Sequence, residues 1–277
     1  MQTFVPLPDF AGSAAVLDDR RLGKQRVEAL QILRALHLDG YGWAAHPAVT
    51  MWQGHTPALV AYGMAVVEEW TGRGHADTTG PLIAEFVHPH RPGAQRDLAA
   101  AGALPPWWGR DDVHRSHRAA LRRKDPARYA TAFPDAPADL DYVWPDPPAP
   151  RPAPGPVAGW VVRGHAGPDR ISLPAQPGEG QAALDGAGRT TKRLRGVRRL
   201  ARALGPGDVV AVPETADVLR VGVLTGGYRR VVARHVRDVR WVTTLRRADL
   251  RAPATLQDSQ AVFPLRDEPE VAAVGER

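Results

Sequence analysis

Glu28 has the clearest potential for chemistry, because polar side chains lead to it along one predicted helix. The stretch LDDRRLGKQRVEALQILRAL, residues 17–36, can be capped at its start by Asp18 or Asp19. Its apolar residues recur at helical spacing, at Leu22, Leu30 and Leu33. Side chains three or four positions apart share one face of a helix, so a basic and amide-bearing row runs through Arg21 and then Lys24 or Gln25 to Glu28. The alternative is a solvated amphipathic helix, in which the Lys24–Glu28 pair contributes about 0.2–0.5 kcal/mol.

The chain's own amino terminus is the one notable partner for Glu28. The first ten residues, MQTFVPLPDF, are apolar and punctuated by proline, so we expect an extended arm that lies on the following helix. An α-amine has an ordinary pKa of about 7.7–8.0, so a fraction is unprotonated at neutral pH and can attack a sugar carbon to form a Schiff base. A nearby carboxylate can stabilise the cationic intermediate and later move protons. Met1 and Glu28 are therefore the candidate catalytic pair.

Charge is distributed unevenly along the 277 residues. Residues 1–156 hold 16 Lys and Arg against 17 Asp and Glu, a net charge of −1, while residues 157–277 hold 20 against 13, a net charge of +7. A basic surface of this kind most commonly binds a phosphate backbone, with acidic membranes as the competing target. The carboxyl-terminal part is therefore expected to find the partner, and double-stranded DNA is the partner we favour.

Several classes of site and location are excluded or disfavoured by composition. The chain has no cysteine, which excludes disulfides, thiol nucleophiles and Cys-ligated metal sites. The first residues lack a basic start followed by an apolar core, and no run of about 18 apolar residues occurs. We expect a monomeric cytoplasmic, nucleoid-associated protein that needs no cofactor and does not bind membranes.

Residues 1–144 are predicted to form an all-α domain. Helical spacing of apolar residues indicates a second core helix over residues 57–70, and shorter helices are expected over 81–87, 97–103 and 127–132. Asp111 or Asp112 is expected to cap a helix that runs to Lys124, where Asp125-Pro126 ends it. No period-2 strand pattern appears in this part.

A proline-rich segment separates this domain from a different pattern. Seven of the twelve residues 145–156 are proline, which predicts an extended linker. Short Val-rich strands are expected over 157–163, 208–212, 219–225 and 236–243, and one helix over 190–204, while the tail from Glu268 is expected to fray. The outer face of that helix is basic, with no acid between its cations: Arg189, Lys192, Arg193, Arg195, Arg198, Arg199 and Arg202. We expect a backbone-tracking surface on a small twisted sheet or partial barrel.

The amino-terminal domain resembles a known family. LDDRRLGKQRVEAL, followed by His46-Pro47 and Gly54-His55, is similar to the pyrimidine-dimer DNA glycosylase/AP lyase family of the endonuclease V type, and the resemblance covers most of residues 1–144. The later block HRSHRAALRRKDPARY, with Trp107-Trp108 before it and Tyr142-Val143-Trp144-Pro145 after it, is similar to an actinobacterial branch of the family. The resemblance implies the helical fold of the family, a catalytic amine at the amino terminus and Glu28 as the catalytic carboxylate.

The resemblance also implies a DNA cleft along the same helix. Arg21 falls at a family histidine and Gln25 at a family acid, positions that line the cleft, and His55 lies near it. The alternative for His55 is a structural hydrogen-bond donor. The basic residue that precedes the family glutamate is Val27 here, so contacts to phosphate or sugar are expected from Arg20, Lys24 or Arg26. Met1-Gln2 is a poor substrate for initiator removal, so the amine of Met1 is expected to serve. An exposed Gln2 would instead cyclise, which leaves a monofunctional reaction in which Glu28 activates water.

A second basic row lies on the predicted helix that ends at Lys124. His114 and His117, followed by Arg118 and Arg122, can face DNA phosphates. Two histidines can also bind a metal, but only with a third placed ligand, so no metal site is predicted.

The carboxyl-terminal part is similar, through shorter words, to PUA-like and EVE-like domains. These words are Gly207-Asp208-Val209-Val210, the stretch 221–226, Tyr228 and the stretch HVRDVRW at 235–241. Such domains hold a modified or flipped base in an aromatic-lined pocket, and the available aromatics are Trp160, Tyr228 and Trp241. Core packing is the alternative for at least one of these tryptophans.

The sequence thus predicts a multi-domain α+β protein: residues 1–144 form a helical glycosylase-like domain, 145–156 a linker and 157–277 a basic, β-rich reader. The expected function is a DNA glycosylase, with AP lyase activity where the amine is free, that excises a damaged or modified base, most readily a pyrimidine, in DNA repair or phage defence. The alternatives are a non-enzymatic DNA-binding protein that kept the scaffold, and a reader of modified RNA.

Overall fold

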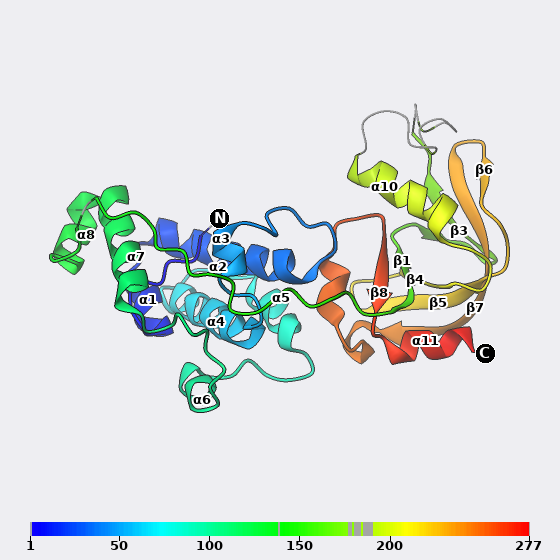
Figure 1. The fold of residues 1–277 in the computed structure, drawn as a ribbon. Coiled ribbons are helices and arrows are strands. Elements are labelled where there is room, and N and C mark those ends of the chain that lie inside the picture. The colour runs from blue at the N-terminus through cyan, green and yellow to red at the C-terminus, as the bar shows by residue number, and fades with distance from the viewer. Residues whose placement is uncertain (1, 138, 177–178, 180–183, 185–190, 277) are drawn as a thin grey trace. The chain divides into compact units, whose positions relative to one another are not determined.

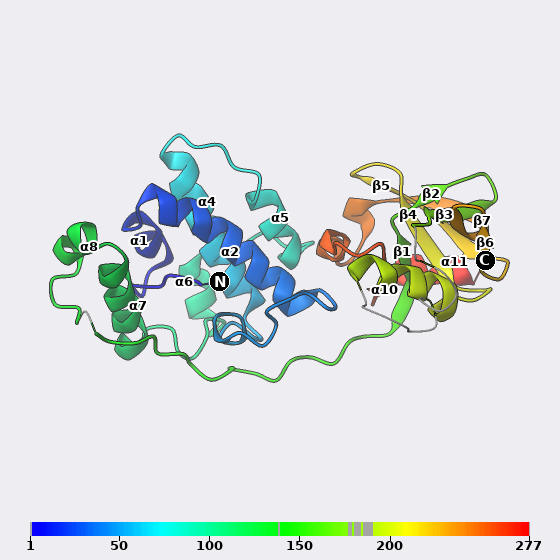
Figure 2. The same cartoon turned by 90° about the horizontal axis from the view of Figure 1, so that it is seen from above.

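The computed structural model describes residues 2–137, 139–176, 179, 184 and 191–276. The chain divides into two compact units, residues 1–152 and 153–277 (Figures 1 and 2). The first unit is built from helices and the second around a sheet, and each is described by itself. None of the described helices is long and apolar enough to cross a membrane.

Two long helices form the centre of the first unit. They are α2 (Asp19–His37) and α4 (Thr56–Gly72), and they pack against each other through fully buried side chains that include Leu22, Leu33 and Leu59. Gly23 permits a close approach at one end, because a Cβ there would lie 2.9 Å from the ring of Trp70. The shorter helices around this pair are α1 (Phe10–Ala15), α3 (Pro47–Thr50), α5 (Gly80–Ala84), η1 (Glu85–Val87), α6 (Gln95–Ala100), α7 (Asp111–Lys124) and α8 (Pro126–Ala132).

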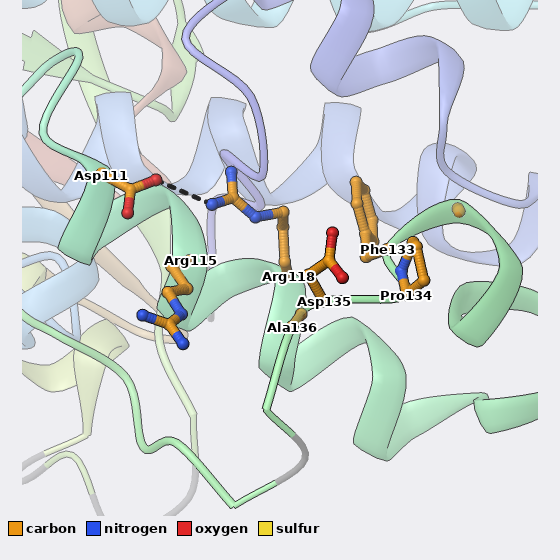
Figure 3. Close-up of a pocket in the computed structure, with 8 residues that line it drawn as sticks. Asp111, Arg115, Arg118, Phe133, Pro134, Asp135 and Ala136 are labelled. Carbon is orange, nitrogen blue, oxygen red and sulfur yellow. Dashed lines mark hydrogen bonds and ion pairs between the residues drawn. The ribbon is translucent and has the colours of Figure 1, made fainter.

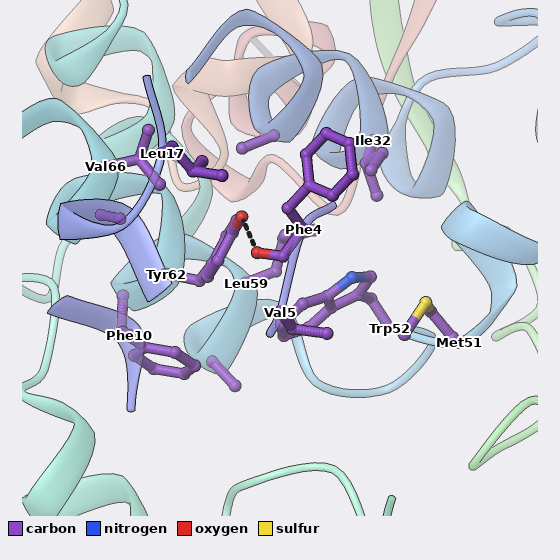
Figure 4. Packing of buried hydrophobic residues seen from close by; sticks show 14 of the residues in the cluster. Phe4, Val5, Phe10, Leu17, Ile32, Met51, Trp52, Leu59, Tyr62 and Val66 are labelled. Carbon is purple, nitrogen blue, oxygen red and sulfur yellow. Dashed lines mark hydrogen bonds between the residues drawn. The ribbon is translucent and has the colours of Figure 1, made fainter. Parts of the chain in front are cut away.

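The first residues of the chain are part of this core (Figure 4). Phe4 and Val5 are buried, and the Tyr62 hydroxyl donates a hydrogen bond of 2.7 Å to the carbonyl of Phe4. The Trp52 indole N–H donates to the Thr3 hydroxyl at 3.1 Å. Since this segment has no strand partner, its buried backbone groups are satisfied largely by side chains.

The second unit contains one mixed sheet with the strand order β2-β3-β7-β5-β4-β1-β8, to which β6 adds by pairing with β7. The β1–β4 pair is parallel and the other pairs are antiparallel. The strands are β1 (Val157–Val162), β2 (His165–Ala166), β3 (Arg170–Pro174), β4 (Val209–Pro213), β5 (Val218–Leu224), β6 (Arg229–Val231), β7 (Arg234–Arg246) and β8 (Val262–Arg266). Among the described strands, β2 and β8 stand at the two ends of this order, so the sheet does not close into a barrel through these pairings.

Helix α10 (Lys192–Arg198) continues into a π-helical turn, η2 (Arg199–Ala203), and packs on one of two hydrophobic clusters through Leu194, Val197 and Leu200. Arg237 of β7 is only 3% exposed and fixes the end of this helix, because its guanidinium donates to the carbonyls of Leu200, Ala201 and Leu204. Thr190 and Arg189, the predicted start of the helix, lie outside the described residues. The short helices η3 (Arg247–Asp249), η4 (Pro253–Gln257) and α11 (Pro269–Gly275) complete the unit.

Two local predictions were wrong. Arg110, rather than Asp111 or Asp112, occupies the N-cap position of α7, and the two carboxylates lie in its first turn. The tail from Glu268 is not frayed over its described part, because Val271 and Val274 of α11 are buried and Glu268 accepts hydrogen bonds from the backbone of Arg251 and Ala252.

The proline-rich segment is bonded along much of its length. Gln53 donates to the carbonyl of Ala149 at 2.6 Å, and Arg151 donates to the carbonyl of Leu36 at 3.1 Å. Farther along, Arg266 donates to the carbonyl of Gly155 at 2.7 Å. Its two ends are therefore each attached to the unit to which they belong.

Candidate functional site

Glu28 lies on the buried face of α2, with 6% of its surface exposed. The start of that helix is fixed by Asp18, which accepts from the backbone N–H of Arg21 and from the hydroxyl of Tyr129. Burial opposes ionisation of Asp18, but its hydrogen bonds to Tyr129 and Arg21 outweigh burial and lower its pKa to about 2. The charged cap therefore sets the register that turns Glu28 inward. Lys24, one turn earlier, holds its ammonium 3.6 Å from the Glu28 carboxylate.

Gln25 connects this helix to the first residues of the chain. It is completely buried, accepts from the backbone N–H of Phe4 at 2.9 Å and donates to the carbonyl of Gln2 at 2.7 Å. Gln25 precedes Glu28 by three residues, so the two side chains lie on the same side of α2. The amide thus holds Gln2 on the face of α2 that carries Glu28. Met1 itself lies outside the described residues.

His114 and His117 of α7 hold the same segment from the other side. The His117 Nδ1 accepts from the backbone N–H of Val5 at 3.4 Å and lies 3.2 Å from the Gln2 side-chain amide. The His114 Nδ1 donates to the carbonyl of Val5 at 2.7 Å, and its Nε2 accepts from the backbone N–H of Gly109 at 3.0 Å. Both rings are therefore neutral, with the proton on Nδ1 of His114 and on Nε2 of His117. Burial lowers the pKa of His114. Burial, followed by the repulsion that His114 exerts when it is protonated, lowers the pKa of His117 to about 3.

Two tyrosines lie within the electrostatic reach of Glu28. Burial raises the pKa of Tyr62 well above its usual value, and the negative charge of Glu28 adds to this shift. Burial also raises the pKa of Tyr142 to about 12, with Arg123 opposing the shift and Glu28 adding to it. Both hydroxyls are therefore protonated at neutral pH and can act as hydrogen-bond donors.

Three buried donors have no hydrogen-bond partner within the described part of the chain: the Nε–H of Arg26, the Nε2–H of His117 and the hydroxyl of Tyr142. The rings of His117 and Tyr142 are neighbours, with their centroids 5.2 Å apart. An unpaired buried donor costs about 1–3 kcal/mol, so such a pair is unusual in a purely structural site. Its chemistry matches a ligand that supplies carbonyl oxygens.

The site therefore combines a buried carboxylate, a fixed amino-terminal segment and unpaired donors under aromatic rings. Residues 1–80 match the family model of the pyrimidine dimer DNA glycosylases. The resemblance expected from the sequence is thereby confirmed for this region. A search of curated proteins and a search of solved structures each returned no match.

Several residues predicted to contact DNA in the glycosylase region have internal partners instead. Gln25, His114 and His117 are buried and bind the amino-terminal segment, so the prediction that they face DNA was wrong. Arg26 pairs with Asp77 and lies over the ring of Trp70 at 4.9 Å from its centroid. Arg21 pairs with Asp18.

The remaining predicted cations and His55 divide into bonded and exposed groups. Arg118 donates to the carbonyl of Pro6 at 3.0 Å and pairs with Asp111, and Arg122 donates to the carbonyls of Pro134 and Ala136. The Nδ1 of His55 is 3.1 Å from the carbonyl of Ala103, to which it donates. Arg20 and Lys24 are exposed on α2. These two cations are the ones that the helix offers to a phosphate backbone.

A hollow of about 380 Å³ lies apart from Glu28, between the start of α7 and the turn after α8 (Figure 3). Arg115 and Arg118 line it together with Asp111 and Asp135, and Arg118 pairs with Asp111 at 2.9 Å. The two guanidinium groups are balanced by two carboxylates, so the hollow has no excess positive charge for an anion. None of the residues predicted to be catalytic lines it.

The predicted base-reading aromatics of the second unit do not contact one another within the described structure. Tyr228 donates or accepts at 2.8 Å with the Nδ1 of His235, and the Trp241 indole donates to the carbonyl of Gly167 at 2.8 Å. Arg220 lies 4.5 Å from the ring centroid of Trp241, and Trp160 lies on β1. All three are half-buried against one hydrophobic cluster. Core packing, the alternative reading, accounts for these contacts.

Sequence reasoning missed why several of these residues matter. Gln25 was read as a cleft residue because its contact to Phe4 spans 21 positions and has no local signature. Tyr142 was noticed only as part of a motif, although Tyr142-Val143-Trp144 in a proline-flanked stretch is an aromatic cluster without helical or strand period. The described residues contain no group of three or more histidines and carboxylates that could hold a metal.

We predict that the helical unit loses stability in acid because His117 must stay neutral. Its folded pKa of about 3 lies below the unfolded value of about 6.5, so its contribution is fully present above pH 6.5 and is lost as the pH falls toward 3. One pH unit below 6.5 the loss is about 1.4 kcal/mol from this group alone. Urea unfolding of wild type and His117→Asn at about pH 7 and about pH 5.5 checks this. His114, whose pKa is also lowered by burial, contributes in both proteins, so a variant with an unchanged pH dependence would contradict the assignment.

Proposed function

We propose that this protein is a DNA glycosylase that excises a damaged pyrimidine, with Glu28 as the catalytic carboxylate and the amine of Met1 as the nucleophile. The observation that carries the proposal is the Gln25 amide, which binds the backbone of Gln2 one helical turn from the buried Glu28. For this reaction the amine of the residue before Gln2 must reach that carboxylate. The match of residues 1–80 to the glycosylase family supports the reaction class.

The reaction can be written with balanced atoms. The neutral amine attacks C1′ of the damaged nucleotide, the bond from C1′ to the base breaks, and the base leaves with the electron pair and takes up a proton. Opening of the sugar ring at O4′, which accepts a proton, gives a Schiff base between the amine and C1′. Glu28 stabilises the cationic intermediate and moves these protons. The same carboxylate can then remove a proton from C2′, which releases the 3′ phosphate and gives AP lyase activity.

We predict that Glu28→Gln lowers base release and abolishes covalent trapping. Removing a positioned acid or base costs about 10²–10⁴-fold in rate, and the amide keeps nearly the same volume. The measurement is sodium borohydride trapping on a duplex that contains one abasic site or one cyclobutane pyrimidine dimer, together with cleavage of the glycosidic bond in the dimer duplex. That cleavage is scored as free base after photoreversal, because the cyclobutane ring otherwise keeps the cleaved base attached to its neighbour. A short amino-terminal extension on the wild-type chain is the matched control for the amine. It should remove the trapped adduct, and any base release that remains would identify a water-activated, monofunctional reaction.

A trapped adduct that persists in Glu28→Gln would contradict the catalytic role of this residue. Full trapping by the extended chain would contradict the role of the amine. If neither trapping nor base release occurred with wild type on abasic, dimer or oxidised-pyrimidine duplexes, a non-enzymatic DNA-binding protein that kept the scaffold would be the better reading.

The unpaired Tyr142 hydroxyl supports a pyrimidine as the substrate. A pyrimidine presents carbonyl oxygens, one of which can accept from the hydroxyl of the half-buried Tyr142, whereas His117 is completely buried. Bulky or modified pyrimidines leave the base stack at lower cost than intact ones, which favours a damaged base.

We predict that Tyr142→Phe separates stability from activity. Deleting a buried hydroxyl that has no partner should leave the free energy of unfolding unchanged or raise it by up to about 1 kcal/mol. Loss of a hydrogen bond to the substrate should lower kcat/KM for base release by about 3- to 10-fold. Tyr129→Phe is the matched control, because its hydroxyl binds Asp18 and should therefore cost stability. Equal activity of Tyr142→Phe and wild type would exclude this role for the hydroxyl.

We further propose that the second unit binds the DNA backbone through a smaller surface than its sequence indicated. Arg193 pairs with Glu179 at 2.9 Å, and Arg199 donates to Gln260 and to the carbonyl of Val262, so these two stabilise the unit itself. Lys192 and Arg195 of α10 are exposed. Arg198 of α10 is half-buried.

We also propose that this unit has a PUA-like or EVE-like fold and reads a modified base, in DNA or in RNA.

An exposed hairpin extends this surface. Glu179, which pairs with Arg193 of α10, also lies 3.2 Å from the Nε2 of His235, and His235 is the partner of Arg230 in the β6–β7 ladder. The helix start and the hairpin are therefore neighbours. Arg230 and Arg234 are exposed on that hairpin. Together with Lys192 and Arg195 they supply positive charge to one side of the unit.

We predict that replacing Lys192 and Arg195 together by Ala flattens the dependence of log affinity on log salt by about 2, because each phosphate contact contributes about 0.9 to that slope. The measurement is fluorescence anisotropy with an unmodified duplex over a salt series. Arg251 is the matched control, since it is exposed and follows Leu250 in the other hydrophobic cluster. A slope that Arg251→Ala changes as much as the double variant does would contradict this surface.

A further inference from the structure

Trp43 is the aromatic side chain that the helical unit exposes most openly. It leaves 64% of its surface accessible, and the other exposed large hydrophobic residues in the described part of the chain are valines. A tryptophan buries 150–250 Å² when it packs, so leaving one in water forgoes a large stabilisation. An exposed indole of this kind is therefore a candidate contact for a binding partner.

The backbone at Trp43 is also held in a costly conformation. Its φ is 72°, in the left-handed region that β-carbon sterics disfavour by about 1–3 kcal/mol. In the loop Asp39-Gly40-Tyr41-Gly42-Trp43, Gly40 adopts this region with a φ of 68°, which costs a glycine little, yet the tryptophan also occupies it. The Trp43 carbonyl accepts from the backbone N–H of His46 at 2.8 Å, which closes the turn that holds the ring outward. Strain of this kind is characteristic of binding sites.

A continuous row of rings connects Trp43 to the candidate active site. The ring centroids of Trp43 and His46 are 5.7 Å apart, those of His46 and Trp144 are 6.0 Å apart, and those of Trp144 and Tyr142 are 5.1 Å apart. Tyr142 lies within the electrostatic reach of Glu28. His46, Trp144 and Tyr142 are half-buried, so the row runs from the exposed indole toward the buried carboxylate.

The contacts along the row leave Trp43 as the ring that can stack. Trp43 meets His46 at 70° and His46 meets Trp144 at 82°, so the inner rings are packed edge to face against one another. Ring contacts of Trp43 within the described residues involve His46, and the rest of its indole faces solvent. A planar, apolar and π-rich partner of the size of a nucleobase fits that face.

Resting on the excision chemistry proposed for Glu28, we propose that Trp43 stacks on the base next to the extruded nucleotide and fills the gap that this nucleotide leaves in the duplex. Moving a nucleotide out of the stack costs a few kcal/mol. An inserted apolar side chain offsets part of that cost, and stacking of an aromatic ring on one base contributes about 1–3 kcal/mol. The ligand of Trp43 is thus the interrupted base stack of double-stranded DNA, whereas Arg20 and Lys24 contact its phosphates.

Binding in the Glu28→Gln background tests this inference without any chemistry. We predict that this parent protein prefers a duplex with one stable abasic analogue over the intact duplex, and that Trp43→Ala loses on the order of 10-fold in affinity for the abasic duplex only. Trp43→Phe should keep most of the preference. A 2-aminopurine next to the abasic position should be quenched by the parent and not by Trp43→Ala. Fluorescence anisotropy and 2-aminopurine emission give the two readouts.

Two matched variants separate stacking from other roles. Arg20→Ala should weaken binding to the intact and abasic duplexes equally, as expected for a phosphate contact. Trp43→Gly relieves the left-handed strain, so it should lose the preference for the abasic duplex without lowering the melting temperature.

The inference is overturned if the parent shows no preference, if Trp43→Ala retains it, or if Trp43→Phe loses as much as Trp43→Ala. Retained base release by Glu28→Gln would refute the catalytic proposal alone, because the binding assay still reports on Trp43.

Discussion

The contact on which the helical unit depends is the pair of hydrogen bonds from the Gln25 side chain to the backbone of Gln2 and Phe4. A buried extended segment must pair each of its N–H and carbonyl groups, and a strand normally does this through a sheet. Here a single amide supplies one donor and one acceptor at the spacing that a neighbouring strand would provide. The segment can therefore cross an all-helical core, and its first residues arrive beside the one carboxylate that α2 turns inward.

The histidines of α7 complete this arrangement because a neutral imidazole is both a donor and an acceptor. His114 gives a proton to the carbonyl of Val5 and His117 accepts from the N–H of the same residue. A charged lysine or arginine at either position would have only donors and would be expensive to bury. The same burial that makes the rings good structural partners removes them from the DNA surface, so one physical requirement explains both their neutrality and their loss as phosphate contacts.

Local order could be predicted from the sequence, and the long-range roles of polar residues could not. The helix through Glu28 is fixed by Asp18 and by apolar spacing, both of which are local, and the family motif lies on it. Gln25 and His117 have partners 21 and 112 or more positions away, and no pattern within a window of the sequence reports such contacts. The glycine-rich stretch that ends at Trp43 predicts a turn, but it does not predict the direction of the ring.

The charge count of the second unit shows the same limit in electrostatic form. The net charge of +7 led us to predict a wholly basic outer face on the helix that contains α10. Several arginines of this unit instead donate hydrogen bonds within it. Arg237 binds the last carbonyls of the helix, Arg193 pairs with Glu179, and Arg163 donates to the carbonyl of Asp258 at 3.0 Å. A guanidinium has five N–H groups and can satisfy several carbonyls where the chain turns without regular structure. In a loop-rich β domain, many arginines are therefore needed as internal hydrogen-bond donors. Only cations that remain exposed, such as Lys192 and Arg195, are available to bind phosphate.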